Sequence, residues 1–151
     1  MSKCKFLLRI DSSDRVGLGH VYRSRELVKE LIKIGFDPIC ILENFKAPLD
    51  LFKEFKVEVL KSNLTVEEEV NQIKDYVIKY NSQYLIVDLL KYRPGYLEFL
   101  SSYSVKLITF HEHQISDNLS DLIVNYNSFE NFSHISKASK ECLGPEYCLF
   151  Q

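Results

Sequence analysis

The sequence predicts an α/β fold with a doubly wound, mostly parallel, Rossmann-like sheet, and three observations support this. Short apolar runs alternate with amphipathic segments, and the links between them are brief. Several apolar runs end in polar residues, at 11–20, at Asp88 and at 111–113, and in a parallel sheet such residues share the carboxyl edge where ligands bind. The 151 residues, 46% hydrophobic and 26% charged, suffice for one domain with a substantial core.

The first half of the chain divides into strands and helices by the spacing of its apolar residues. We expect strands at 5–10, 37–42 and 57–60, and helices at 20–34 and 49–55. In the first helix Leu27, Val28 and Leu31 recur at helical spacing, and Gly35 is well placed to end it.

The second half contains the clearest helix of the chain. Thr65 and Glu68 form the pattern of a capping box, and Asn81 can close the helix. The stripe of apolar residues between them is Val66, Val70, Ile73, Val77 and Tyr80. Beyond it we expect strands at 85–88, 105–110 and 122–124, and a helix that starts near Pro94 and runs to about 102.

The loop between the first strand and the first helix contains the most informative residues. Gly17 and Gly19 lie two positions apart, directly before His20. A strand that leads through Gly-x-Gly into a helix presents free backbone N–H groups at a positive helix end, which suits an anion or a sugar hydroxyl. Taken alone, the pattern is equally compatible with a tight turn followed by a capping imidazole. Tyr22 occupies the third glycine position of the dinucleotide fingerprint, so the sequence disfavours a nicotinamide cofactor.

Polar residues precede the glycines, and turn chemistry alone explains most of them. Ser12, Ser13 and Asp14 are residue types that favour turns and helix starts. Asp11 ends the first strand and could orient His20 or hold a substrate hydroxyl. A carboxylate on one imidazole nitrogen fixes the tautomer and raises the basicity of the other nitrogen.

Other catalytic and metal-binding patterns are weak or missing. His111-Glu112-His113 invites a metal interpretation, but two histidines without a further ligand cluster fit a solvated loop better. The sequence has neither a Gly-x-Ser-x-Gly elbow nor a phosphate-binding Walker loop. We therefore expect no metal and no cofactor.

Composition limits the partners. The net charge of −2 gives no reason to expect nucleic acid or an anionic membrane. No apolar run is long enough to span a bilayer, and Arg9 and Asp11 interrupt the apolar start, so it does not resemble a signal peptide. The four cysteines form no Cys-x-x-Cys pair, which predicts reduced thiols in a cytoplasmic protein.

Taken together, these motifs resemble one enzyme family. Arg9-x-Asp11-x-Ser13, followed by Gly17-x-Gly19-His20-x-x-Arg23, is similar to the start of the UDP-2,4-diacetamido-2,4,6-trideoxy-β-L-altropyranose hydrolases of pseudaminic acid biosynthesis and the related spore-coat polysaccharide proteins. The later segments 85–88, 121–125 and 144–151 resemble family landmarks in the same order. The resemblance spans the whole chain but only the amino-terminal half of the family's enzyme.

The resemblance implies a glycosyltransferase-B-like architecture. It also implies hydrolysis of a UDP-linked diacetamido-trideoxy-hexose to UDP and free sugar, for nonulosonic acid or surface polysaccharide synthesis. His20 would be the catalytic residue. The implied substrate-binding residues are Arg9, Asp11, Ser13, Gly17, Gly19, Arg23 and Asp88. The alternatives are a glycosyltransferase-like domain and a non-catalytic half-domain that binds sugar or a partner.

The sequence departs from the family's pattern at three places. Leu90 stands where the family often has tyrosine after the Asp88 strand, although Tyr92 is near. His111-Glu112 replaces a pair of aspartates, and Gln151 replaces a final arginine.

The resemblance also predicts the domain boundaries. Residues 1–143 would form the amino-terminal Rossmann-like domain and 144–151 the start of an interdomain linker, with the second domain absent. The implied partners are the nucleotide-sugar substrate and a carboxyl-terminal nucleotide-binding domain or subunit.

Overall fold

The computed structural model describes residues 4–13, 18–110, 119–125 and 141–143. Within these residues, seven strands form one sheet in the order β3-β2-β1-β4-β5-β6-β7. The strands are β1 (Lys5–Ile10), β2 (Asp37–Leu42), β3 (Lys56–Val59), β4 (Tyr84–Asp88), β5 (Lys106–Phe110), β6 (Leu122–Asn125) and β7 (Glu141–Leu143). Every neighbouring pair is parallel. The predicted doubly wound Rossmann-like sheet is confirmed.

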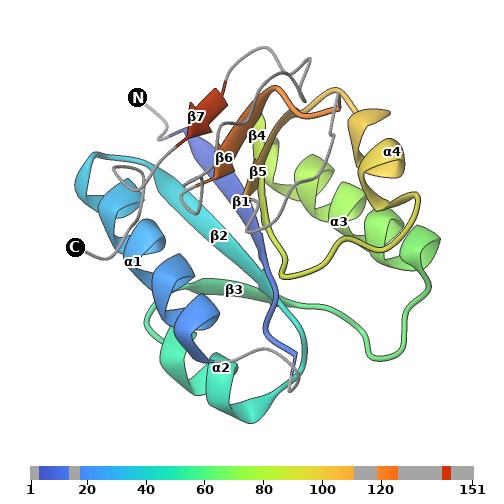
Figure 1. The fold of residues 1–151 in the computed structure, drawn as a ribbon. Helices are drawn as coiled ribbons and strands as arrows, with labels where there is room; N and C mark the ends of the chain where they lie inside the picture. The colour runs from blue at the N-terminus through green and yellow to red at the C-terminus, as the bar shows by residue number, and fades with distance from the viewer. Residues whose placement is uncertain (1–3, 14–17, 111–118, 126–140, 144–151) are drawn as a thin grey trace.

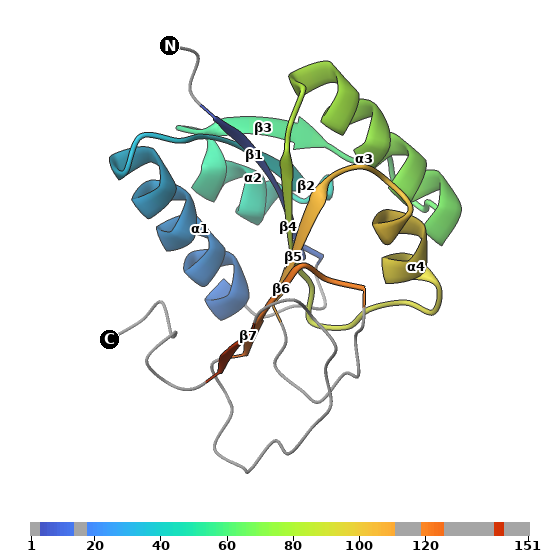
Figure 2. The same ribbon diagram turned by 90° about the horizontal axis from the view of Figure 1, so that it is seen from above.

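Helices cover both faces of the sheet. Helices α1 (Leu18–Lys33) and α2 (Lys46–Phe52) lie on one face, and α3 (Val66–Tyr80) and α4 (Tyr96–Ser101) lie on the other (Figures 1 and 2). Strand β1 pairs with β2 on one side and β4 on the other, and the chain changes faces between them. The carboxyl ends of β1 and β4 therefore flank the switch point of the sheet, where such folds bind ligands.

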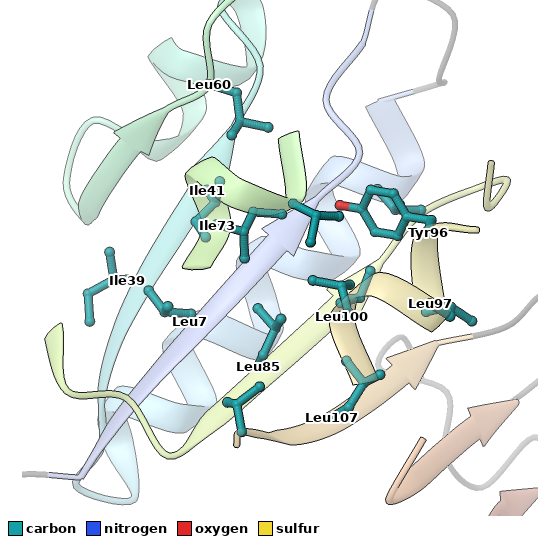
Figure 3. Close-up of a cluster of buried hydrophobic side chains, with 14 residues drawn as sticks. Leu7, Ile39, Ile41, Leu60, Ile73, Leu85, Tyr96, Leu97, Leu100 and Leu107 are labelled. Atoms are coloured by element: carbon teal, nitrogen blue, oxygen red, sulfur yellow. The ribbon is translucent and has the colours of Figure 1, made fainter. Parts of the chain in front are cut away.

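Each face of the sheet has its own apolar core. On the α3–α4 face, Leu7 and Leu85 pack with Ile73 and Leu100 from the helices (Figure 3). On the α1–α2 face, Leu8 and Ile86 belong to the cluster that contains Val28 and Phe52. Alternate residues of one strand serve the two cores because successive side chains point to opposite faces.

The helix ends follow the predicted local chemistry. Thr65 and Glu68 form the capping box, and Asn81 ends α3 in the left-handed conformation at φ 48°. Gly35 follows α1 with φ 98°, a conformation that glycine adopts without strain.

Three elements differ from expectation. Helix α2 starts three residues before the predicted position, with Pro48 in its first turn, where a missing N–H costs little. Helix α4 begins at Tyr96 after an N-cap at Gly95 (φ 79°), so Pro94 lies before the helix. Strand β7 has only three residues and was not predicted.

The described cysteines Cys4, Cys40 and Cys142 are free thiols. No helix in the described part of the chain is long and apolar enough to cross a bilayer. The segment 111–113, with its two histidines, and the predicted linker 144–151 lie outside the described residues.

Candidate functional site

A buried polar cluster, which we call the His20 cluster, lies at the switch point of the sheet. It comprises His20, Arg23 and Ser24 of α1 and Asp88 at the end of β4, and all four are buried. Positions 20, 23 and 24 share one face of a helix because they are three and four residues apart. This face meets the carboxyl end of β4, so residues far apart in sequence come into contact.

Asp88 is the centre of the His20 cluster. Its Oδ1 lies 2.9 Å from His20 Nε2 and also accepts a hydrogen bond from Arg23 Nη2. Its Oδ2 accepts a hydrogen bond from Ser24 Oγ at 2.6 Å. Burial by itself would raise the pKa of Asp88, but the His20 hydrogen bond and the Arg23 charge together lower it. Asp88 is therefore a buried carboxylate that its neighbours keep ionised.

His20 is held at both ring nitrogens. Nε2 lies next to the Asp88 carboxylate, and Nδ1 lies 2.9 Å from Arg23 Nη2. In the neutral ring, Nε2–H donates to Asp88 and Nδ1 accepts from Arg23. Burial alone would lower the pKa of His20, but the hydrogen bond and charge of Asp88 outweigh it and raise the pKa. A proton on Nδ1 would face a guanidinium N–H, so proton uptake there requires Arg23 to move.

The sequence left two roles open for Asp11, and the structure assigns the His20 contact to another residue. Asp88, not Asp11, is the carboxylate on His20. Asp11 Oδ1 instead accepts hydrogen bonds from Ser13 N and Oγ at 3.3 and 3.1 Å, and Leu90 N donates to its Oδ2 at 3.3 Å. Asp11 thus ties the loop after β1 to the loop after β4.

Arg9 lies in a second charged group, which we call the Arg9 network. Its Nε donates to Glu69 at 2.7 Å, its Nη2 donates to Glu43 at 2.6 Å, and its Nη1 donates to the Ile10 carbonyl. The side chain is 3% exposed. Each of the three guanidinium nitrogens therefore donates to a protein acceptor.

The carboxylates of the Arg9 network extend it across the sheet edge. Glu43 Oε2 accepts from Ser12 N and Oγ at 2.8 and 2.7 Å. Glu69 accepts from Tyr96 Oη at 2.8 Å and from Arg93. Burial raises the pKa of Glu43, but Arg9 and Ser12 lower it further than burial raises it. The network links segments that follow four different strands.

A cleft of about 570 Å³ opens in front of the Arg9 network. Its walls come from the segments after β1, β2, β3 and β4, together with Glu69 and Tyr96. Of the predicted site residues, Arg9, Asp11 and Ser13 line this cleft. His20, Arg23 and Asp88 are not part of its lining and form the separate His20 cluster.

Of the two glycines in the predicted motif, the structure describes only Gly19. Gly17 lies outside the described residues. Gly19 is exposed in the first turn of α1, and a Cβ placed on it would have no heavy atom within 4 Å. The packing of the described residues therefore does not require glycine there, and the N–H groups of this first turn have no helical acceptor.

Several residues of these two groups were not predicted as site residues. Glu69 lies between Val66 and Ile73 in the apolar stripe of α3 and is buried. A charged residue in such a stripe was the signal that could have found it. Ser24 follows His20 by one helical turn, and this spacing was its signal. Tyr92 belongs to neither group and lies two positions after Leu90, where the resemblance predicted a tyrosine. Its hydroxyl lies 3.0 Å from both the Val87 and the Phe110 carbonyl oxygens.

Comparison with known proteins defines the class of fold. The seven-stranded parallel sheet with helices on both faces resembles one half of a glycosyltransferase-B-type fold. No protein-family model matches the sequence, and no curated protein matches it.

Two solved structures illustrate this similarity. One is a glycosyltransferase from Rickettsia africae ESF-5, with a TM-score of 0.61 and 14% identity over 83% of this chain and 37% of that chain. The other is MurG from Acinetobacter baumannii, with a TM-score of 0.62 and 10% identity over 91% of this chain and 44% of that chain. The chain thus spans less than half the length of the structures it matches, and at these identities the similarity establishes the fold alone.

Proposed function

We propose that the chain is the amino-terminal half of an enzyme that hydrolyses a UDP-linked diacetamido-trideoxy-hexose to UDP and free sugar. The observation that carries the proposal is the His20 cluster at the switch point of the sheet, within the Gly17-x-Gly19-His20-x-x-Arg23 motif. A carboxyl-terminal nucleotide-binding half would complete the site, because remote binding energy positions the reacting bond.

In this mechanism His20 is the general base. Nδ1 takes a proton from water as the water oxygen bonds to the anomeric carbon, and the bond from that carbon to the β-phosphate oxygen breaks so that UDP leaves with its electron pair. Asp88 on Nε2 holds the ring and stabilises the imidazolium that forms. The exposed first turn of α1 at Gly19 leaves room for a sugar or diphosphate near backbone N–H groups.

Arg23 must move before His20 can act. Its Nη2 lies 2.9 Å from His20 Nδ1, the atom that has to accept the proton. A diphosphate oxygen is a strong competing acceptor for a guanidinium. Binding of the substrate would thus draw Arg23 away from the ring and free Nδ1. This step couples the availability of the base to the binding of an anionic substrate.

The test measures UDP release from UDP-linked amino sugars by the chain mixed with a nucleotide-binding carboxyl-terminal half. We expect His20→Asn to lower the rate by about 100-fold or more, the range for loss of a general base. Tyr22→Phe is the matched control, since Tyr22 is exposed on the same turn of α1. An unchanged rate in His20→Asn would exclude the assigned role.

A second candidate is transfer of the sugar to an acceptor, which the glycosyltransferase-type fold favours. His20 could deprotonate an acceptor hydroxyl as readily as water. Product analysis with and without acceptor separates the two, because a transferase forms a glycoside only when acceptor is added. Binding of the nucleotide sugar without UDP release would instead indicate a non-catalytic binding half-domain.

A further inference from the structure

The cleft in front of the Arg9 network has a charge balance that points to its ligand. Two buried or half-buried carboxylates, Glu43 and Glu69, face two guanidinium groups, Arg9 and Arg93. These four charges balance one another within the protein. The remaining charged residues of the lining are Asp11, Lys61 and Lys91, which leaves one net positive charge for a ligand.

Lys61 and Lys91 are the cationic side chains of the lining that can bind an anionic ligand. Both side chains are exposed, and within the described ranges neither ammonium group has a hydrogen bond or ion pair. They lie on different loops, one after β3 and the other after β4. Arg9, by contrast, donates from all three guanidinium nitrogens to protein acceptors.

The start of α3 offers no alternative anion site beside the cleft. The Thr65 side chain accepts from the Glu68 N–H, and the Glu68 side chain accepts from the Thr65 N–H. Glu67, Glu68 and Glu69 occupy the first turn, and they oppose a further negative charge. An anion in this cleft therefore depends on the two lysines.

The rest of the lining suits a hydroxylated molecule. Ser13, Asn44 and Ser62 supply hydroxyl and amide groups, and Leu60, Leu89 and Phe45 supply apolar surface. A lining that contains both polar groups and apolar side chains can contact the hydroxyl groups and the C–H faces of a sugar ring. A volume of about 570 Å³ lies within the range of small-molecule sites.

We propose that this cleft binds a sugar that carries a phosphate group, with Lys61 and Lys91 holding the phosphate. Arg9, whose guanidinium donates to Glu43, then also positions Glu43 and the loop at Ser12. The proposal uses none of the residues of the His20 cluster, but Arg9, Asp11 and Ser13 of the lining are among the substrate-binding residues that the resemblance implies. The proposal therefore concerns ligand binding in this cleft and not the role of His20 in hydrolysis.

The test titrates the intact chain with N-acetylglucosamine 1-phosphate and follows backbone amide shifts by NMR. We expect shifts at cleft residues such as Asn63 and Leu64, and about five- to tenfold weaker binding in Lys61→Gln and in Lys91→Gln, as for loss of one charged hydrogen bond. Lys53→Gln is the matched control, because Lys53 is exposed and outside the lining. Higher salt should weaken binding to the original chain more than to either cleft variant.

Two reference ligands make the proposal refutable. N-acetylglucosamine and inorganic phosphate should each bind at least about tenfold more weakly than the sugar phosphate, since each lacks half of the contacts. Equal binding of the neutral sugar would overturn the role of the lysines, and equal binding of inorganic phosphate would overturn the sugar specificity. Absence of cleft shifts at about 20 mM sugar phosphate, which would place the Kd well above that concentration, would overturn the site. The readout is binding, so a failed UDP-release assay does not decide the outcome.

Discussion

Asp88→Asn is the most informative substitution in the His20 cluster, because it removes the charge and keeps the size. The carboxylate is 3% exposed and accepts hydrogen bonds from His20, Arg23 and Ser24. In the variant the buried Arg23 guanidinium loses its carboxylate partner. Breaking a buried ion pair on one side costs about 3–5 kcal/mol, a large share of the roughly 5–15 kcal/mol that stabilises a typical domain.

The pH dependence of this loss follows from the two pKa shifts. The pKa of Asp88 is lowered in the folded state, so its stabilisation is present above the ordinary value near 3.8 and is lost as the pH falls through the folded pKa. The pKa of His20 is raised, so its stabilisation is complete below about 6.5 and is lost as the pH rises through the folded pKa. The difference between the original chain and the variant should therefore be largest between about pH 4.5 and 6.5.

The variant should also reverse the direction in which the stability of the chain changes with pH near neutrality. Without the Asp88 charge, burial and Arg23 both lower the pKa of His20, so the unfolded state binds the proton more readily. Acidification from about pH 7.5 to 5.5 should then destabilise Asp88→Asn, whereas it stabilises the original chain.

Urea unfolding followed by circular dichroism at several pH values measures both effects. Asp50→Asn is the matched control, because Asp50 is exposed, and its unfolding curve should follow that of the original chain. A loss below about 1 kcal/mol, the size of a surface ion pair, would refute the reasoning for Asp88→Asn. So would parallel pH profiles of the variant and the original chain.

Two further predictions concern residues outside the His20 cluster and the Arg9 network. Thr65→Ala removes the capping box of α3, and we expect it to lower the free energy of unfolding in urea by about 1 kcal/mol. The control Ser62→Ala, in the preceding loop, should lower it by less than half as much, and equal losses would show that the cap does not stabilise the helix. Burial raises the pKa of Cys40 to about 12, so we expect a thiol reagent at about pH 8 to label the half-buried Cys4 well before Cys40 in the native chain, as mass spectrometry of peptides can measure. Urea should abolish that difference, and rapid labelling of native Cys40 would contradict the buried position.

The fold was predictable from sequence because its signals are local and repeated. The apolar runs at β1, β2 and β4 and the capping box at Thr65 each point to one structure, and all of them agree. Strand β7 lacked such a signal, since Glu141–Leu143 has only three residues.

The candidate site was predictable only in part, because its contacts join residues far apart in the chain. The motif identified His20 and Arg23, but sequence alone could not assign Asp88 as the carboxylate on His20, 68 positions away. Arg9 illustrates a different limit. Its residue type suggests a ligand contact, but sequence alone could not show that Glu43 and Glu69 accept hydrogen bonds from its guanidinium.

The Arg9 network also constrains how this sequence can vary. Glu43, Arg9, Glu69 and Arg93 alternate in sign along one chain of contacts. Replacing Arg9 alone leaves the carboxylates of Glu43 and Glu69 without this cationic partner. Replacing both Arg9 and Glu69 by apolar residues instead removes one charge of each sign. Homologous chains should therefore differ at these positions in matched sets, and covariation between Arg9 and Glu69 should exceed that of either with the other members.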